Sequence, residues 1–465
     1  MMRNGFVLAV MVAAAWAGPA SADVVISTDA TQNMSCSGGV CAPTATDAVL
    51  NVTDLENLLA AGNVDVVTTN GSIQANNIDI TGAFSWSAAS SLTLDADQSV
   101  TFSAYVQNLS TANVALVTND GGTGGALTFL LGPGKLDTNA LSINGEAYKM
   151  ADSVNQLAAE IGIKPSGRFA LSRDTNAGKD GPYYNSPIPV GFSGSFNGLG
   201  HKISNLEILD TGNLESAALF LEVKTKGSLA SVFLEHATVR AGDSAASLVV
   251  TNYGTIGNTS ASGKVYGRSA GGLININKGN VTGSWANVSV HSKYDAGGLV
   301  NINLGVISQS FAQGNTIAKG VGGLIEENVD TGTISDCYSL GSSSSKHDNG
   351  NSSVGGFVGY NFVGSIATSY SVGAVSAGHA TRIPKGAKIG GFSGYSEGTV
   401  STSYWDTDTS GTEQGSGDGN ETGLTGLTTA QFQSGLPSGF DPSIWAEDPG
   451  INNGFPYLIA NPPPQ

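Results

Sequence analysis

The sequence predicts an all-β fold, a parallel β-solenoid with short capping or inserted helices. The chain has 64 Gly among 465 residues and only 12% charged residues, which is typical of turn-rich β proteins rather than of disordered chains. It is longer than the roughly 250–300 residues at which one hydrophobic core stops growing. It also repeats one short phrase several times, which indicates an elongated architecture of stacked units.

The first 22 residues have the features of a signal peptide. Arg3 precedes an apolar run over 6–17, and small residues at 20–22 provide a cleavage site that would leave Asp23 as the first residue. The sequence therefore predicts an exported protein, either secreted or held at the cell surface. Outside 1–22 no stretch reaches the roughly 18 apolar residues of a membrane helix, so we expect no transmembrane helix in the mature chain.

Residues 23–147 are expected to form an N-terminal cap and β-solenoid rungs. Apolar and polar residues alternate there in short runs, which is the period of a β-strand. A helix near 49–60, capped by Asn51 or Thr53, would shield the open end of the sheets. Cys36 and Cys41 would form a small disulfide loop in an oxidising compartment, with free thiols as the alternative.

Residues 148–190 are expected to be a connecting segment with one short helix. Val154, Leu157, Ala158 and Ile161 follow helical spacing, so the segment 151–161 predicts an amphipathic helix that lies on the solenoid. A packed structural insert is favoured over a regulatory docking helix.

Residues 191–411 contain the repeats. Five clear copies of the phrase begin at Gly pairs, namely at Gly271, Gly297, Gly322, Gly355 and Gly390. In the second half of each copy a small residue precedes an aromatic one, as in Ser284-Trp285, Ser310-Phe311, Cys337-Tyr338, Ser369-Tyr370 and Ser403-Tyr404. A unit of this size cannot bury its own apolar side, so we expect the copies to stack coaxially in one continuous rod.

Stacking in register would place equivalent residues directly above one another. An asparagine recurs at one position of the copies, namely Asn252, Asn277, Asn303, Asn328 and Asn361. These side chains are predicted to form a structural hydrogen-bonded ladder at a corner, and a ligand-binding row is the alternative. The paired glycines are interpreted as corner residues that supply backbone angles other residues avoid.

The repeat pattern resembles the GLUG repeats of bacterial filamentous haemagglutinin-like exoproteins. The segment 192–206 resembles the one that precedes those repeats, and 403–411 the one that closes them, so the resemblance covers roughly residues 140 to 460. It implies a right-handed parallel β-helix and a secreted or cell-surface role that is often adhesive. The large haemagglutination domain of the long family members is not recognised in this sequence.

Residues 412–465 are expected to form a C-terminal cap and tail. A brief helical turn is predicted at 428–433. The tail also has a group of aromatic residues that should cover the last rung, because large aromatic side chains bury much apolar area: Phe432, Phe440, Trp445, Phe455 and Tyr457.

The charge pattern argues against two classes of partner. The net charge is −17, and no cluster of Lys and Arg is visible along the sequence. Nucleic acids and anionic membrane surfaces both require such clusters, so neither is expected as a partner.

No catalytic residues are predicted, and the protein is expected not to be an enzyme. A glycosidase site needs paired carboxylates, but the acids of the repeats fall at non-equivalent positions: Asp295, Glu326, Glu327, Asp330, Asp336 and Glu397. The five histidines are also scattered: His201, His236, His291, His347 and His379. Cys337 occupies the position of a small serine in the other copies and is interpreted as a packing residue.

No cofactor is expected either. Asp406, Asp408, Ser410 and Gly411 imitate the opening of a calcium loop, but its twelfth residue is Gly417 rather than Glu. A polar turn is favoured, and a weaker calcium site near Asp406 and Asp408 is the alternative.

The leading functional hypothesis is a monomeric adhesion or surface-binding protein. Its partner would be an extracellular glycan or a surface protein, contacted through an extended face lined by Ser, Thr, Asn and Gly. A carbohydrate-active enzyme of the polysaccharide lyase or hydrolase kind, and a structural matrix component, are the alternatives.

Overall fold

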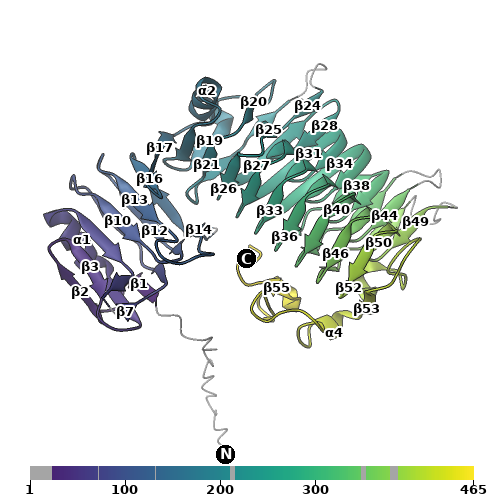
Figure 1. Cartoon of the computed structure of the whole chain (residues 1–465). Helices are drawn as coiled ribbons and strands as arrows, with labels where there is room; N and C mark the ends of the chain where they lie inside the picture. Colours follow the sequence, from purple (N-terminus) through teal and green to yellow (C-terminus); the bar gives the residue numbers. More distant parts are fainter. Residues whose placement is uncertain are drawn as a thin grey trace, which may run out of the picture.

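The structure is a computed structural model that describes residues 23–464, apart from 72, 131, 210–214, 347–351 and 378–385. The predicted signal peptide, residues 1–22, lies outside the described residues. The described part is all-β, as predicted: large parallel sheets dominate, with four short α-helices (Figure 1). No helix in the described ranges is long and apolar enough to cross a membrane.

The strands between residues 23 and 143 form what we call the N-terminal stack. The chain passes in turn through three parallel sheets, and a strand pairs with its equivalent in the next passage; Leu92, for example, lies between Val64 and Val114. The inward apolar side chains form one core. The strands are β1 (Asp23–Ser27), β4 (Ala48–Asn51), β8 (Asn77–Ile80), β11 (Val100–Phe102) and β14 (Leu127–Phe129); β5 (Val64–Val67), β10 (Leu92–Asp95), β13 (Val114–Val117) and β16 (Leu141–Ile143); and β9 (Phe84–Trp86), β12 (Tyr105–Asn108) and β15 (Lys135–Asp137).

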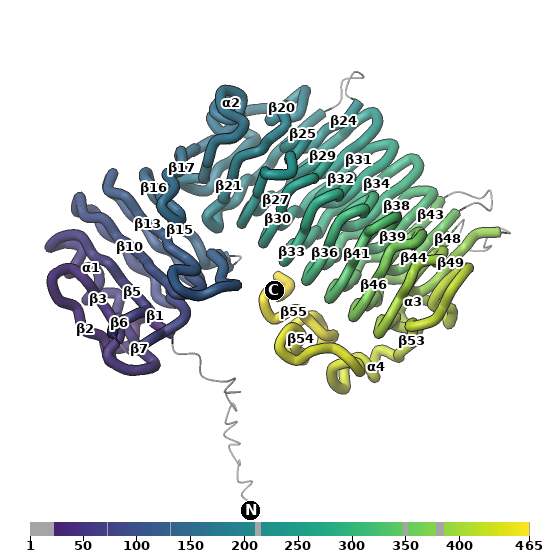
Figure 2. The backbone as a smooth tube through the Cα atoms, in the orientation of Figure 1, coloured from purple at the N-terminus to yellow at the C-terminus, as the bar shows by residue number. Residues whose placement is uncertain are grey.

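The strands between residues 146 and 406 form the C-terminal stack, which contains the repeats. The smooth tube in Figure 2 shows its successive passages lying parallel. One of its sheets has eight strands, at one position per passage: β20 (Ile188–Phe192), β25 (Phe220–Val223), β29 (Val249–Asn252), β32 (Ile274–Asn277), β35 (Val300–Asn303), β40 (Ile325–Val329), β45 (Val358–Phe362) and β50 (Ser393–Ser396).

A second sheet of the C-terminal stack continues from β16 of the N-terminal stack. Its strands are β17 (Glu146–Ala151), β18 (Arg168–Leu171), β21 (Ser195–Asn197), β26 (Ser228–Ala230), β30 (Thr255–Gly257), β33 (Asn280–Thr282), β36 (Val306–Ser308), β41 (Thr333–Ser335), β46 (Ser365–Ala367) and β51 (Thr399–Ser401). The third sheet has longer and more irregular strands: β19 (Thr175–Asn176), β22 (Lys202–Ser204), β23 (Glu207–Ile208), β24 (Ser216–Ala217), β27 (Phe233–Arg240), β28 (Ser244–Ala246), β31 (Ser260–Gly271), β34 (Trp285–Gly297), β37 (Phe311–Ala312), β38 (Thr316–Ala318), β39 (Gly320–Gly322), β42 (Tyr338–Ser339), β43 (Ser343–Ser345), β44 (Ser353–Gly355), β47 (Tyr370–Ser371), β48 (Val375–Ala377), β49 (Lys388–Gly390), β52 (Ser403–Asp406) and β53 (Leu424–Leu427).

The repeat copies stack in register within the C-terminal stack, as predicted, because Gly271, Gly297, Gly322, Gly355 and Gly390 pair from one strand to the next. The N-terminal stack does not continue their core. Between β16 and β17 the chain reverses in an antiparallel hairpin whose turn residues, Asn144 and Gly145, both have positive φ. After this hairpin the hydrophobic core lies on the opposite face of the shared sheet. Strand β18 shows the change: Ala170 packs into the N-terminal core, and its neighbours Phe169 and Leu171 pack into the C-terminal core. The sheet is continuous, but the hydrophobic cores on its two sides are separate.

The glycine pairs have a different role from the predicted one. None of the ten glycines in the five pairs has positive φ, so unusual backbone angles do not explain them. Close approach does: a Cβ on Gly322 would lie 1.6 Å from the Ile325 carbonyl oxygen, and one on Gly323 would lie 2.0 Å from the Gly356 carbonyl oxygen. The pairs permit a tight corner in which backbone touches backbone, within a rung and between rungs.

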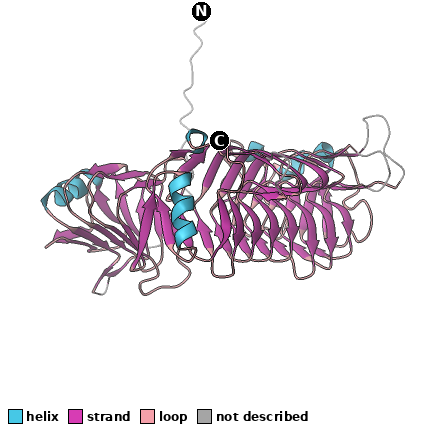
Figure 3. Cartoon of the chain, turned by 90° about the horizontal axis from the view of Figure 1, so that it is seen from above, coloured by secondary structure: helices cyan, strands magenta, loops and turns pink. Residues whose placement is uncertain are grey.

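Two helices accompany the stacks at the predicted places (Figure 3). Helix α1 (Val52–Ala61) begins at Asn51, whose side chain accepts hydrogen bonds from the next turn, and it buries Leu55 and Leu59 against the N-terminal core. Helix α2 (Val154–Ile163) lies at the junction of the stacks and is capped by Ser153. Its buried face packs into the C-terminal core.

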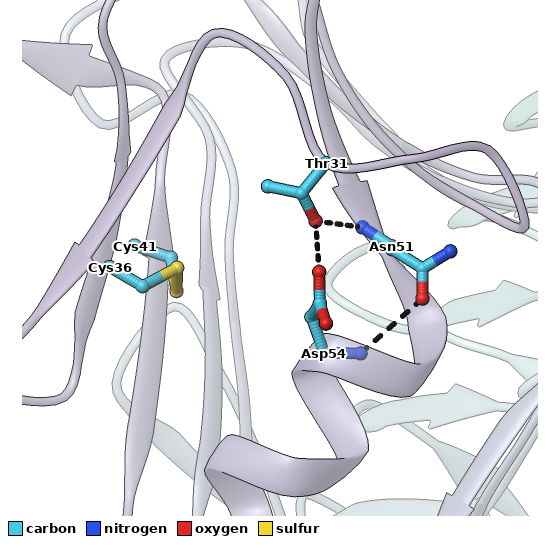
Figure 4. The surroundings of a disulfide bond; sticks show 5 residues. All are labelled: Thr31, Cys36, Cys41, Asn51 and Asp54. Atoms are coloured by element: carbon cyan, nitrogen blue, oxygen red, sulfur yellow. Dashed lines mark hydrogen bonds between the residues drawn. A yellow bond between two sulfur atoms is a disulfide. The ribbon is translucent and has the colours of Figure 1, made fainter.

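The cysteine pair lies in a hairpin beside α1. Strands β2 (Met34–Ser37) and β3 (Val40–Pro43) are antiparallel, and their turn is made by Gly38 and Gly39, both with positive φ. Cys36 and Cys41 are directly opposite each other across the two strands and form a disulfide (Figure 4).

The first part of the C-terminal tail pairs with the last rung, through β53 beside β52 and through bridges from Ser416 to Ser393 and from Gly419 to Ser396. The rest of the tail folds back along the C-terminal stack. The tail contains α3 (Thr407–Ser410), α4 (Thr429–Phe432), β54 (Trp445–Ala446) and β55 (Tyr457–Leu458), and it returns toward the centre of the molecule (Figure 1). The aromatic residues of the repeats form a stacked row outside the main core: Trp285, Phe311, Tyr338, Tyr370 and Tyr404. Four of the five predicted tail aromatics pack on this row, namely Phe432, Phe440, Trp445 and Phe455.

Candidate functional site

The predicted asparagine column is a continuous ladder of buried amides. From Asn252 to Asn328 each Nδ2 donates to the Oδ1 of the next rung, at 2.8 Å from Asn252 to Asn277 and at 2.9 Å from Asn303 to Asn328. Asn361 Nδ2 donates to the Ser396 hydroxyl. The amides of Asn252, Asn277 and Asn303 also bond to the backbone of the adjoining turn, as between Gly254 N and Asn252 Oδ1. All five asparagines are fully buried, so the ladder is a corner support and offers no surface to a ligand.

Asp406 and Asp408, the two aspartates that resemble the start of a calcium loop, form hydrogen bonds with other residues of the protein. Asp406 is buried, and its Oδ1 accepts the backbone N–H groups of Asp408 and Thr409, which caps α3. Its Oδ2 accepts the Thr429 hydroxyl at 2.6 Å. Asp408 Oδ2 accepts the Thr429 backbone N–H, so both side chains bind the start of α4 to the last rung.

Three of the repeat acids come together, although the sequence suggested that none would. Asp295 belongs to β34, and Glu326 and Glu327 to β40. Burial raises the pKa of both glutamates, and the charge of Asp295 raises it further. The sequence alignment of copies missed them because they occupy different columns and meet across a corner between two sheets. Of the other acids, Asp336 accepts the Trp445 indole N–H and the Thr368 hydroxyl, and Glu397 accepts the Tyr395 hydroxyl.

An aromatic and basic row lies on the outer side of the third sheet. Arg240, Tyr266 and His291 are in register on β27, β31 and β34. The Arg240 guanidinium lies 3.8 Å from the centre of the Tyr266 ring, and the Tyr266 and His291 rings stack with centroids 5.3 Å apart. Burial lowers the pKa of His291, and the nearby charges of Lys346, Lys264 and Arg240 lower it further.

More cations surround this row. Arg268 and Lys293 lie 5.1 Å and 5.3 Å from the Tyr294 ring, and the backbone N–H of Lys319 donates to the Tyr294 carbonyl oxygen. We call this surface the basic face and define it by Arg240, Lys264, Tyr266, Arg268, His291, Lys293, Tyr294, Lys319 and Lys346. It holds six of the 20 Lys and Arg residues of the chain, so the prediction that these residues do not cluster is wrong.

The basic face arises from rung spacing. Its residues lie on strands about 4.8 Å apart, so cations separated by some 25 residues in sequence become neighbours. Two carboxylates lie at its margin: Asp243, 4.0 Å from the Arg268 Nε, and Asp295 beside Lys319. The sequence signal that could have revealed the face is a Lys or Arg three or four residues before three of the glycine pairs, at Arg268, Lys293 and Lys319.

A second polar cluster fills the junction between the stacks. It borders a cavity of about 490 Å³ that is lined by Tyr105, Gly132, Pro133, Lys135, Asp137, Arg173 and Asp174. His201 is fully buried beneath it, with Nε2 2.8 Å from the Leu136 carbonyl oxygen and Nδ1 3.3 Å from Asp174 Oδ1. Asp174 also accepts the Lys135 ammonium at 2.6 Å, so this cluster connects the N-terminal stack to the C-terminal stack.

The junction cluster should make stability depend on pH in acid. Burial opposes the charged form of Asp174, but hydrogen bonds from His201 and Lys135 outweigh it and hold the pKa of this carboxyl well below its usual value. The stabilisation that the Asp174 carboxylate provides is therefore complete above about pH 4, the pKa of an aspartate in the unfolded chain. It is lost progressively as the pH falls below that value. We expect Asp174→Asn to lower the melting temperature at pH 7 and to differ less from the wild type at pH 2.5. A deficit that grows on acidification would contradict this.

Comparison with known proteins adds one local similarity. No family model matches the chain. A segment of 84 residues, 18% of the chain, is 40% identical to part of a halomucin from Haloquadratum walsbyi. The match spans 1% of that protein.

Proposed function

We propose that this protein is an exported right-handed β-helix of the GLUG-repeat kind that acts at the cell surface or after secretion as an adhesion or binding protein. The basic face is its binding surface, and the partner is an extracellular glycan that carries acidic groups. The short similarity to a halomucin is compatible with a surface protein. The sequential pairing of one passage with the next supports the β-helix.

The basic face is the observation that carries this proposal. On a protein of net charge −17, six cations gathered on one rigid sheet form a local site for anions that the rest of the surface repels. The strand spacing of about 4.8 Å is close to the advance of one sugar residue along an extended polysaccharide. Cations on successive strands can therefore meet successive carboxylate or sulfate groups of one glycan chain.

The arrangement of the aromatic rings favours a glycan over a nucleic acid. Proteins that bind single-stranded nucleic acids stack the bases on free ring faces. The two faces of Tyr266 are already covered, by Arg240 and by His291. The face therefore offers charge and ring edges, which suit hydroxyl and acidic groups better than bases.

The burial of Glu326 argues against the alternative of a polysaccharide-cleaving enzyme. Cleavage would require two carboxylates that reach the bond between two sugars. Among the acids of the repeats, Glu326 and Asp295 lie together, but Glu326 is only 3% exposed. A polymer chain on the surface cannot touch it.

Binding to polysaccharides immobilised on a biosensor tests the proposal. We expect the mature protein to bind dextran sulfate and polygalacturonate, to ignore uncharged dextran, and to lose affinity as salt is raised. Replacing Lys264, Lys293 and Lys346, all exposed, by Gln should weaken binding about tenfold. Three contacts of about 0.5 kcal/mol each contribute about 1.5 kcal/mol, and about 1.4 kcal/mol corresponds to a tenfold change in affinity.

The matched control removes the same charge elsewhere. Lys164, Lys179 and Lys226 are exposed and lie outside the basic face, and their replacement by Gln should leave affinity nearly unchanged. Equal losses in both triple variants would show only a general charge effect and would refute the site. Tighter binding to single-stranded DNA than to either acidic polysaccharide would overturn the glycan as partner.

A further inference from the structure

A row of buried polar side chains runs along the corner between the eight-stranded sheet and the third sheet. Its members occupy equivalent positions on β32, β35 and β40, namely Asn275, Asn301 and Glu326. Each follows a residue that is paired between these strands, as Ile274 is with Val300 and Val300 with Ile325. The exposed fractions of Asn275, Asn301 and Glu326 are 1%, 0% and 3%. Buried polar groups in proteins nearly always have hydrogen-bond partners. Here Asn275 Oδ1, both amide atoms of Asn301 and Glu326 Oε2 have none among the described residues.

The opposite wall of this corner contributes a second carboxylate. Asp295 of β34 pairs with Gly320 of β39. A Cβ on Gly320 would lie 2.5 Å from Glu326 Oε1 and 2.9 Å from Asp295 Oδ1. Both carboxyl groups therefore occupy the space above this glycine, where any other residue would push them apart.

The negative charge at this corner is not balanced by the side chains around it. Burial raises the pKa of Glu326 well above its ordinary value, and the charges of Glu327 and Asp295 raise it further. Burial raises the pKa of Asp295, and the charge of Lys319 offsets this only in part. Glu326 forms no ion pair within the described ranges. A carboxylate that is both desolvated and beside other carboxylates is costly unless a positive charge or a proton offsets it.

We propose that this corner is a binding site for a hard divalent cation of the calcium class, held by the carboxylates of Asp295 and Glu326 and by the amide oxygen of Asn301. Calcium binds six to eight oxygen atoms, and protein sites commonly mix carboxylates, amide and backbone carbonyls and water. No three His, Cys, Asp or Glu side chains of the described chain are placed to hold one ion, so amide, backbone and water oxygens complete the shell. The cation would join two sheets and successive rungs.

The ligand chemistry separates this site from the turn at Asp406 and Asp408. In that turn the carboxylate oxygens already accept hydrogen bonds from α3 and α4. At the corner, Glu326 Oε2 and Asn301 Oδ1 are buried and have no partner. Of these two places, the corner is therefore the one that has oxygen atoms whose burial a cation would explain.

Calorimetric titration of calcium chloride into the mature protein, stripped with EDTA, tests the site. We expect saturable binding that weakens tenfold or more in Glu326→Gln and is unchanged in Asp408→Asn, the matched control in the other acidic turn. Binding that Glu326→Gln leaves intact, or that Asp408→Asn removes, would refute the assignment. No binding to the wild type at millimolar calcium, or tighter binding of magnesium, would do so as well.

Thermal melting distinguishes loss of the site from loss of the fold. In EDTA, Glu326→Gln should melt at or above the wild-type temperature, because a neutral amide is easier to bury than a carboxylate. Adding calcium should raise the melting temperature of the wild type and leave that of Glu326→Gln unchanged. An equal rise in both proteins would overturn the proposal, and so would a variant that is less stable than the wild type in EDTA.

Discussion

Gly322→Ala should destabilise the protein by about 4 kcal/mol or prevent it from folding, a large effect for the addition of one methyl group. The new Cβ would lie 1.6 Å from the Ile325 carbonyl oxygen and 2.7 Å from the Gly359 backbone nitrogen. Both atoms belong to the backbone, so no side chain can rotate to make room. Relief requires the corner of one rung to open, which breaks its pairing with the next.

Gly257→Ala is the matched control for this change. Gly257 lies in the same stack, and an added Cβ there would meet only the Thr282 methyl group, at 3.8 Å. The substitution should be neutral or stabilise by up to about 1 kcal/mol, through the reduced freedom of the unfolded chain. Urea unfolding of both variants checks the prediction. Similar unfolding midpoints for the two would show that the corner is not as tight as the distances indicate.

Trp445→Ala should lower the free energy of unfolding by about 4 kcal/mol. Trp445 is 1% exposed, and its ring lies 4.6 Å from Phe440 and 6.0 Å from Tyr338, measured between centroids. Its indole N–H also donates to Asp336. Removing the indole ring leaves a cavity between the tail and the aromatic row, and it also removes the hydrogen bond that joins the tail to Asp336.

The control for Trp445 lies in the same tail. Ile459 is 48% exposed, so Ile459→Ala should change stability by less than about 1 kcal/mol. Limited proteolysis gives a second measurement, since a loosened tail should be cleaved before the stacks are. A Trp445→Ala protein with wild-type stability and an uncleaved tail would show that the tail is not held by this contact.

The repeats made the stacking predictable because identical residues recur at near-constant spacing. The column from Asn252 to Asn361 follows directly from alignment of the copies, and so does the position of Cys337 among the serines. Helix α1 was predictable from the cap residue Asn51 and its apolar spacing. These features depend on local sequence and on equivalence between copies.

Features that join non-equivalent positions were beyond such an alignment. Glu326 and Asp295 belong to different columns and meet only because the glycine pairs fold one sheet against the next. The packing of the tail on the aromatic row was also beyond the alignment, since sequence alone does not show that the tail returns along the repeats. The reversal at Asn144 and Gly145 had a readable signal, because Asn-Gly is the typical turn of a hairpin. What the turn does not reveal is that the core changes side there.

The returning tail has a consequence for the order in which the molecule can be completed. Asn461 donates to the Gln309 carbonyl oxygen across 152 positions of sequence, and Tyr370 donates to the Pro456 carbonyl oxygen. Every rung that the tail contacts precedes it along the chain. The surface on which the tail packs therefore exists only once those rungs are paired in register. A shift of one residue in the strand register of any of these rungs would misplace one ring of the aromatic row. The tail can therefore dock only on a correctly assembled stack. In a misassembled chain the aromatic row would stay exposed, and the undocked tail would be accessible to proteases.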